Sequence, residues 1–113
     1  MSIELKDQEV APGVVVVRIA GKLVMPAIND QIATLVDSLL HEGARTIVFD
    51  LAGITTLDST GVGQFISSFN KIGAAGGEMR MAAATGHVMT TFHISRLNTV
   101  FKFYPTVEAA TAG

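Results

Sequence analysis

The sequence predicts an α/β domain with a mostly parallel sheet of four or five strands, an N-terminal β-hairpin and about four helices. Two observations support this prediction. Short segments of β-rich composition alternate along the chain with segments whose apolar residues recur at helical spacing. Strands and helices that alternate in this way favour a sheet with parallel strands. Because 113 residues, 49% of them hydrophobic, can fill one modest core, we expect residues 1–113 to form a single domain.

The first segments predict the hairpin. Ser2–Lys6 alternates around two apolar residues, as a short edge strand does, and Ala11–Gly13 is a strong turn signal. Val14–Ala20 is apolar on both faces except for Arg18, which indicates a strand that is covered on both sides. We expect this second strand to end at Gly21.

Two helices flank a central strand in the next part of the chain. The first helix begins at Pro26, a residue favoured at the first helical position, and ends at Gly43, which suits a left-handed cap. Thr46–Leu51 has the β-branched and apolar content of a buried strand. A second amphipathic helix follows from Gly61. Its apolar stripe comprises Val62, Phe65, Ile66, Phe69 and Ile72.

The last third of the chain predicts two more strands and two shorter helices. Glu78–Ala83 is a strand, Thr85 or Gly86 begins a weaker helix, Phe101–Tyr104 is a last short strand, and Pro105 starts a terminal helical turn. In an open parallel sheet, the loops that leave the carboxyl ends of the strands gather on one rim, where sites usually lie. Three loops are expected on this rim: residues 21–25, 52–60 and 83–87.

Composition and charge exclude several kinds of protein. The formal net charge is −2 and the basic residues are scattered singly, so we expect no nucleic-acid partner. The absence of cysteine excludes disulfides and thiolate chemistry. The charged start of the chain is unlike a signal peptide, and the apolar run Val14–Val17 is far too short to cross a bilayer. We therefore expect a cytoplasmic protein without membrane insertion, and nothing in the sequence indicates an obligate dimer.

Asp58-Ser59-Thr60-Gly61 lies at the start of the second helix and allows two interpretations. In the first, a short oxygen side chain caps the helix by accepting from its free N–H groups, an interaction worth about 1 kcal/mol. In the second, Ser59 receives a phosphoryl group, because the N–H groups and dipole of a helix start favour negative charge. That group would add about −1.5 to −2 charge beside Asp58. Residue preferences alone favour the cap.

A serine hydrolase is the enzymatic alternative, with the three histidines as candidate bases. His41 falls near the end of the first helix, far from the expected rim, whereas His87 opens the third helix and His93 lies within it. Neither of these two has an acidic partner at a recognisable spacing, and no G-x-S-x-G elbow surrounds Ser59. No two histidines stand at i, i+4 and no carboxylates cluster. We therefore expect no enzymatic activity, metal site or cofactor.

The run Leu57–Gly63, reading LDSTGVG, resembles the central motif of the STAS domain family, and most closely that of its free-standing bacterial anti-sigma factor antagonists. Residues 76–79, reading GGEM, match the family's pattern at the end of the following helix. Residues 21–23 stand where the family has G-x-L, and residues 97–101 resemble its L-x-x-V-F. The similarity covers nearly the whole chain and implies a STAS-like fold.

The resemblance implies partner switching in transcription regulation. In such systems, the unphosphorylated antagonist binds an anti-sigma factor that is also an ATP-using serine kinase, and this frees the sigma factor. The kinase phosphorylates the serine after the motif aspartate and ends the binding, and a metal-dependent phosphatase of the PP2C type restores it. On this chain the phosphorylated residue is Ser59. The implied partner-binding residues are Leu23, Val24, Met25, Asp58, Thr60, Gly61 and Val62.

Two positions depart from the family pattern. An acidic residue commonly follows G-x-L and is thought to help dock the kinase, but this chain has Val24, followed by Met25. A glycine usually ends the third helix before the leucine of the pattern, where this chain has Arg96. Either the helix ends differently or Arg96 faces the rim. The first departure leaves open a constitutive STAS scaffold or accessory module, without phospho-regulation, in a larger signalling or transport assembly.

Overall fold

The computed structural model describes residues 3–24 and 31–112. Its strands form one five-stranded sheet in chain order, and the β1–β2 pair is antiparallel whereas the other pairs are parallel. This arrangement confirms the predicted fold class. The strands are β1 (Glu4–Ala11), β2 (Val14–Leu23), β3 (Thr46–Leu57), β4 (Glu78–Ala82) and β5 (Lys102–Tyr104). The helices are α1 (Gln31–His41), α2 (Ser59–Ala74), α3 (Gly86–Ile94) and α4 (Val107–Thr111), with a 3₁₀ turn, η1 (Leu97–Thr99).

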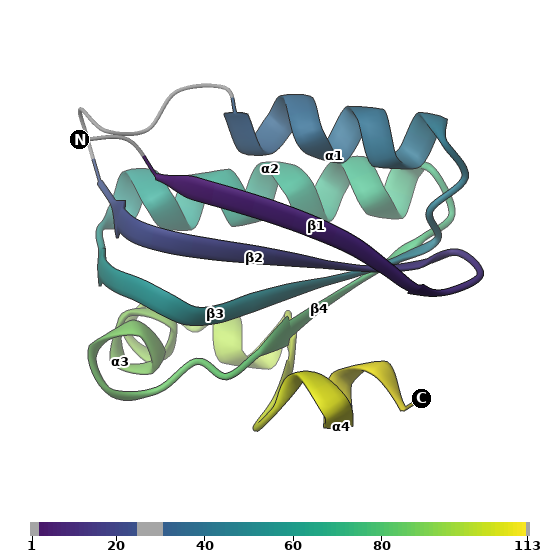
Figure 1. Cartoon of the computed structure of the whole chain (residues 1–113). Helices are drawn as coiled ribbons and strands as arrows, with labels where there is room; N and C mark the ends of the chain where they lie inside the picture. The colour runs from purple at the N-terminus through teal and green to yellow at the C-terminus, as the bar shows by residue number, and fades with distance from the viewer. Residues whose placement is uncertain (1–2, 25–30, 113) are drawn as a thin grey trace.

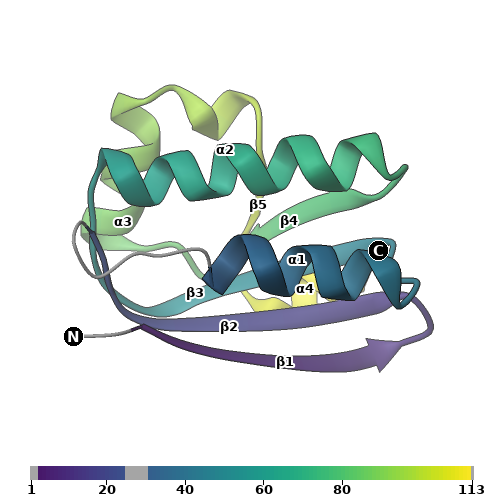
Figure 2. The same cartoon turned by 90° about the horizontal axis from the view of Figure 1, so that it is seen from above.

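The helices form two layers around the sheet. α1 and α2 lie on one face, and α3 and α4 lie on the other (Figure 1). Seen from above, α1 and α2 run side by side over the strands (Figure 2). The main core lies beneath these two helices and extends to α3 through a chain of aromatic rings, in which Phe65 of α2 contacts Phe49 at 5.3 Å and Phe92 of α3 at 5.7 Å between centroids. A smaller cluster of Val48, Ala82 and Ala110 lies under α4.

The two central strands are longer than predicted. β2 does not end at Gly21 but continues to Leu23, and β3 continues past Leu51 to Leu57. The added segments pair with each other as far as Leu23↔Leu57, with two shifts in register, and they bury Ile54 and Leu57. Residues 21–23 and 52–57 are therefore strands rather than the predicted loops.

Two predicted helix boundaries agree with the structure, whereas α2 begins two residues before the predicted Gly61 and α4 begins two residues after the predicted Pro105. The predicted start of the first helix at Pro26 lies outside the described residues, but this helix ends before Gly43, whose φ of +103° confirms the left-handed cap. The third helix begins at Gly86, as expected. The assignment of Ile66 to the buried stripe of α2 was wrong. Ile66 is 40% exposed, because the neighbouring Phe65 and Phe69 take the core-facing positions.

The end of α3 tests the first alternative for Arg96, that the helix ends differently; that Arg96 faces the rim stays a prediction. The helix ends at Ile94, and Arg96 follows in the left-handed conformation with φ +60° and an exposed side chain. The Arg96 N–H donates to the His93 carbonyl at 3.0 Å. This chain thus has the backbone turn that a glycine favours, but an arginine makes it.

Candidate functional site

The candidate site lies where the extended ends of β2 and β3 meet the start of α2. Leu23 and Leu57 are partners in the parallel register, and the Asp58 N–H donates to the Leu23 carbonyl at 3.4 Å. Strand β3 ends at Leu57, and α2 begins two residues later at Ser59. The strand pair therefore fixes the point from which the helix leaves the sheet.

Asp58 is the cap of α2. Its backbone is extended, with φ −116° and ψ −174°, and its Oδ1 accepts from the N–H groups of Thr60 and Gly61, both at 3.0 Å. The Val62 N–H closes the first helical turn on the Asp58 carbonyl at 2.9 Å. Of the hydroxyl and carboxylate groups in D-S-T-G, it is the carboxylate that satisfies the first-turn donors.

Ser59 is left with an uncommitted hydroxyl. It is the first residue of α2 and is exposed, whereas Asp58 and Thr60 on either side are half-buried. Within residues 3–24 and 31–112, the Ser59 side chain makes no hydrogen bond. Since Asp58 supplies the cap, a change at the Ser59 oxygen leaves the capping bonds in place.

Gly61 allows α2 to start in close contact with the strand ends. A Cβ atom at this position would lie 2.6 Å from Leu57 Cδ1 and closer still to the Leu23 carbonyl oxygen. Leu23 and Val62 are themselves buried, so their side chains pack in the core beneath the rim. The part of Leu23, Gly61 and Val62 in partner binding stays a prediction. Val24 is half-buried at the end of β2, and Met25 lies outside the described residues.

A histidine contact at this rim was not anticipated from the sequence. The Leu57 N–H donates to Nε2 of His87, in the first turn of α3, at 3.4 Å. Sequence reasoning placed His87 on the near rim but considered it only as a catalytic base. The sequence did contain one indication of this contact: His87 lies at the start of the helix that follows β4, and β4 is the strand next to β3.

The chemistry expected of a hydrolase or metal site is not assembled in the described part of the chain. No group of three or more His, Asp or Glu side chains there could hold a metal ion. The His87 contact is with a backbone N–H rather than with Ser59, and His41 is at the far end of α1. No helix within the described ranges is long and apolar enough to cross a membrane.

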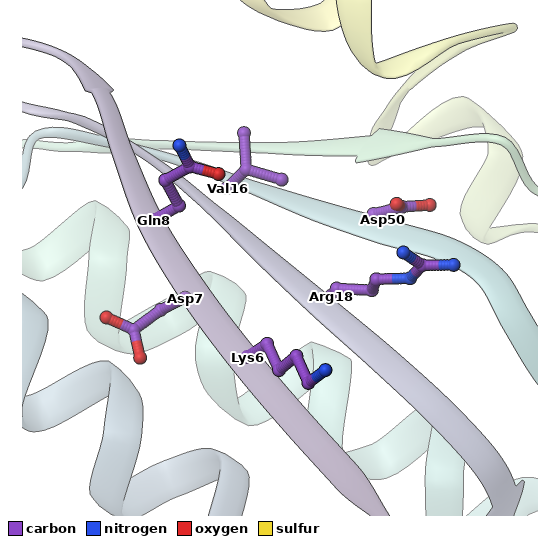
Figure 3. Close-up of a pocket in the computed structure, with 6 residues that line it drawn as sticks. All are labelled: Lys6, Asp7, Gln8, Val16, Arg18 and Asp50. Carbon is purple, nitrogen blue, oxygen red and sulfur yellow. The ribbon is translucent and has the colours of Figure 1, made fainter.

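A second feature is a shallow hollow of about 440 Å³ on the sheet face opposite α1 and α2. In the strand register Arg18 lies between Lys6 and Asp50, so cationic and anionic side chains stand next to each other across it (Figure 3). This mixed charge favours no one class of ligand. The lining residues are Lys6, Asp7, Gln8, Val16, Arg18 and Asp50.

The chain belongs to the STAS domain family, whose model matches residues 6–110. This finding confirms the resemblance that the motif predicted. The fold is also similar to several solved structures. An anti-sigma factor antagonist from Mycobacterium paratuberculosis superposes with a TM-score of 0.81 at 21% identity, over 96% of this chain and 90% of that one.

Two further structures show how widely this fold is used. The Bacillus cell fate determinant SpoIIAA in its phosphorylated form superposes with a TM-score of 0.71 at 23% identity, over 94% of this chain and 96% of that one. A sulfate transporter family protein from Wolinella succinogenes gives a TM-score of 0.70 at 15% identity, over 93% and 87% of the two chains. At these identities the likeness establishes the fold, and function has to be argued from the site.

Proposed function

We propose that this chain is an anti-sigma factor antagonist whose binding to an anti-sigma factor is controlled by reversible phosphorylation of Ser59. The observation that carries this proposal is the division of roles at the start of α2, where Asp58 caps the helix and the exposed Ser59 hydroxyl has no partner among the described residues. Membership of the STAS family supports it, as does the likeness in fold to SpoIIAA, which was solved in a phosphorylated form.

The local geometry suits a phosphoserine. Transfer of the γ-phosphoryl group of ATP to Ser59 Oγ, with loss of the hydroxyl proton, adds about −1.5 to −2 charge. The helix dipole of α2 stabilises this charge, and the capping bonds of Asp58 do not involve the modified oxygen. The fold therefore survives modification, and the change is confined to the charge that a partner meets.

The surface around Ser59 is suited to a partner that is sensitive to such a charge. Gly63 and Ile66 follow Ser59 on the exposed side of α2, and Ile66 presents an apolar side chain that is 40% exposed. An apolar contact beside a neutral hydroxyl becomes unfavourable once a doubly charged phosphate requires water. In this proposal, phosphorylation ends binding by desolvation and repulsion rather than by unfolding.

The proposal includes the partners and setting of such a switch. The anti-sigma factor acts as the serine kinase, a PP2C-type phosphatase removes the phosphate, and the antagonist itself catalyses nothing. The protein acts in the cytoplasm as a single domain, a monomer when free. The test is incubation with the cognate kinase and ATP, followed by mapping of phosphate by mass spectrometry. We expect phosphate on Ser59 and none on the Ser59→Ala variant; phosphate on Thr60 instead would contradict the assignment.

A constitutive STAS scaffold is the second candidate. It is favoured by Val24, which stands where the family pattern commonly has an acidic residue, and by the likeness in fold to a sulfate transporter family protein. Partner binding by Ser59→Ala and Ser59→Asp separates the two candidates. For a switch, the Ala variant binds like the unmodified protein and the Asp variant binds at least about tenfold more weakly, which corresponds to about 1.4 kcal/mol. Equal binding would indicate the scaffold.

A further inference from the structure

The end of β3 extends beyond its neighbour β4, so its last backbone groups have no hydrogen-bond partner on that strand. The last paired residues of β3 and β4 are Asp50 and Ala82, whereas β3 continues to Leu57. On this side, the N–H of the buried Leu57 has no strand to donate to, and a buried N–H without a partner is unfavourable. His87 takes the place of the missing strand, since its Nε2 accepts from the Leu57 N–H at 3.4 Å.

This contact requires one protonation state of His87. Nε2 can accept only when it carries no proton, so the imidazole is neutral with its proton on Nδ1. In the imidazolium form both ring nitrogens are donors, and Nε2–H would oppose the Leu57 N–H. Protonation of His87 would therefore remove the acceptor of the Leu57 N–H.

The contact lies two residues before Ser59. Cα atoms two residues apart are at most about 7.6 Å from each other, so the end of β3 and the candidate phosphorylation site are adjacent in space. We infer that His87 is a positioning residue for Ser59: its neutral form holds the end of β3, and its protonation releases that end and places a cation beside the start of α2. A further consequence, which rests on the proposed function, is that phosphate on Ser59 and a proton on His87 favour each other, because opposite charges attract and such coupling is reciprocal.

The other charged groups at this junction can be named. Asp58 lies between β3 and α2 and favours the imidazolium, whereas Lys22 on β2, the strand partner of Thr56, opposes it. α3 itself carries one other titratable side chain, His93, six residues further along and exposed.

The test is an NMR titration of the ¹⁵N-labelled chain from pH 8 to pH 5. We expect the amide resonances of Leu57 and Ser59 to follow the His87 imidazole with the same midpoint. In His87→Gln the side-chain oxygen can accept without titrating, so the Leu57 amide shift should stay constant. In His87→Ala the acceptor is lost, and amide exchange at Leu57 should become faster by about 2- to 12-fold at pH 8, the range of one hydrogen bond.

Two results would overturn the inference: a Leu57 amide that does not titrate in the unmodified chain, or one that titrates equally in His87→Gln. The latter variant keeps the test decisive even if His87→Ala does not fold. Repeating the titration after phosphorylation should move the His87 midpoint to higher pH. If the kinase leaves Ser59 unmodified, the proposed function fails while the Leu57 titration still stands. If Ser59 is phosphorylated but the Leu57 amide does not titrate, only the role of His87 fails.

Discussion

Two residues, one at the start of α2 and one after the end of α3, show how residue type and local backbone structure depend on each other. Arg96 has φ +60°, a conformation that is unfavourable for an L-residue by about 1–2 kcal/mol and carries no such penalty for glycine. Gly61 shows the opposite case, because its missing side chain is what lets α2 approach the Leu23 carbonyl. Introducing a glycine at position 96 should therefore stabilise the fold, whereas replacing the glycine at position 61 should destabilise it.

Replacing Arg96 with glycine should stabilise the fold. We expect Arg96→Gly to raise the free energy of unfolding by about 0.5–1 kcal/mol, since relief of the left-handed strain exceeds the greater backbone entropy of glycine in the unfolded chain. Urea unfolding followed by circular dichroism measures this. Ser95→Gly is the matched control: Ser95 has an ordinary helical φ of −80°, so glycine there should lower stability. Equal effects at both positions would contradict the strain argument.

Adding one methyl group at Gly61 should be destabilising. In Gly61→Ala, the Cβ atom would overlap the Leu23 carbonyl, a backbone group that cannot move aside, and we expect a loss of about 1–3 kcal/mol. Gly63→Ala is the control two residues along the same helix, where nothing lies within 4 Å of the added atom. There alanine should raise stability by up to about 1 kcal/mol through its helix propensity. Thermal unfolding of both variants separates the steric effect from the effect on the helix.

At the scale of elements, one carboxylate connects the last two strands. Glu78 on β4 accepts hydrogen bonds from Nε of Arg80 on the same strand and from Nζ of Lys102 on β5, both at 2.9 Å. Arg80 Nη1 also donates to the Ala110 carbonyl of α4 at 2.7 Å. The pKa of Glu78 is held below its ordinary value, mainly by the hydrogen bond from Arg80 and next by the hydrogen bond from Lys102. Because β5 has three residues, these side-chain contacts supplement a short backbone ladder.

The lowered pKa of Glu78 gives this contact a defined pH dependence. A carboxyl group whose pKa is depressed by folding stabilises the native state above its unfolded pKa, and this contribution is lost as the pH falls through the folded value. The pairs are partly exposed, so we expect Glu78→Gln to lower the free energy of unfolding at pH 7 by about 0.5 kcal/mol. The difference should vanish as the pH falls through the lowered pKa of Glu78, where the native carboxyl group becomes protonated. Glu42→Gln, at an exposed site without an ion pair among the described residues, should show no such trend.

The order and type of the elements could be predicted from sequence, but their lengths could not. Hydrophobic periodicity predicted the hairpin and the alternation of strands and helices. Gly21 was expected to end its strand, whereas Gly21 and Gly53 both lie in a continuing strand pair with two shifts in register. A Cβ atom at Gly53 would lie 2.9 Å from Ala20 Cβ, so the close approach of the two strands there requires a glycine. At the site, sequence placed Ser59 correctly at a helix start. It could not show that Asp58 is the cap, because both residue types cap helices well.

In the whole molecule, the residues that stabilise the fold are distinct from Ser59, the residue at the rim whose charge would change on phosphorylation. The main core lies between the sheet and the pair α1 and α2 and extends to Val88 and Phe92 of α3, while Ser59 is at the N-terminal end of α2, exposed and outside the capping bonds. A negative charge added there can change binding without disturbing the core. The contact between His87 and Leu57 links the third helix to this junction through a titratable side chain.

This separation predicts that a phosphate mimic preserves the fold. We expect Ser59→Asp to change the free energy of unfolding by about +0.3 to +1 kcal/mol at low ionic strength, because a negative charge in the first turn interacts favourably with the helix dipole. Ser67→Asp makes the same exchange at an exposed position in the middle of α2, where the dipole has little effect, and should leave stability nearly unchanged. The difference between the two variants should shrink in 0.5 M salt, as screening requires. If Ser59→Asp instead unfolds the chain, the loss of binding in that variant would reflect loss of structure, and a switch that acts through surface charge alone would have to be abandoned.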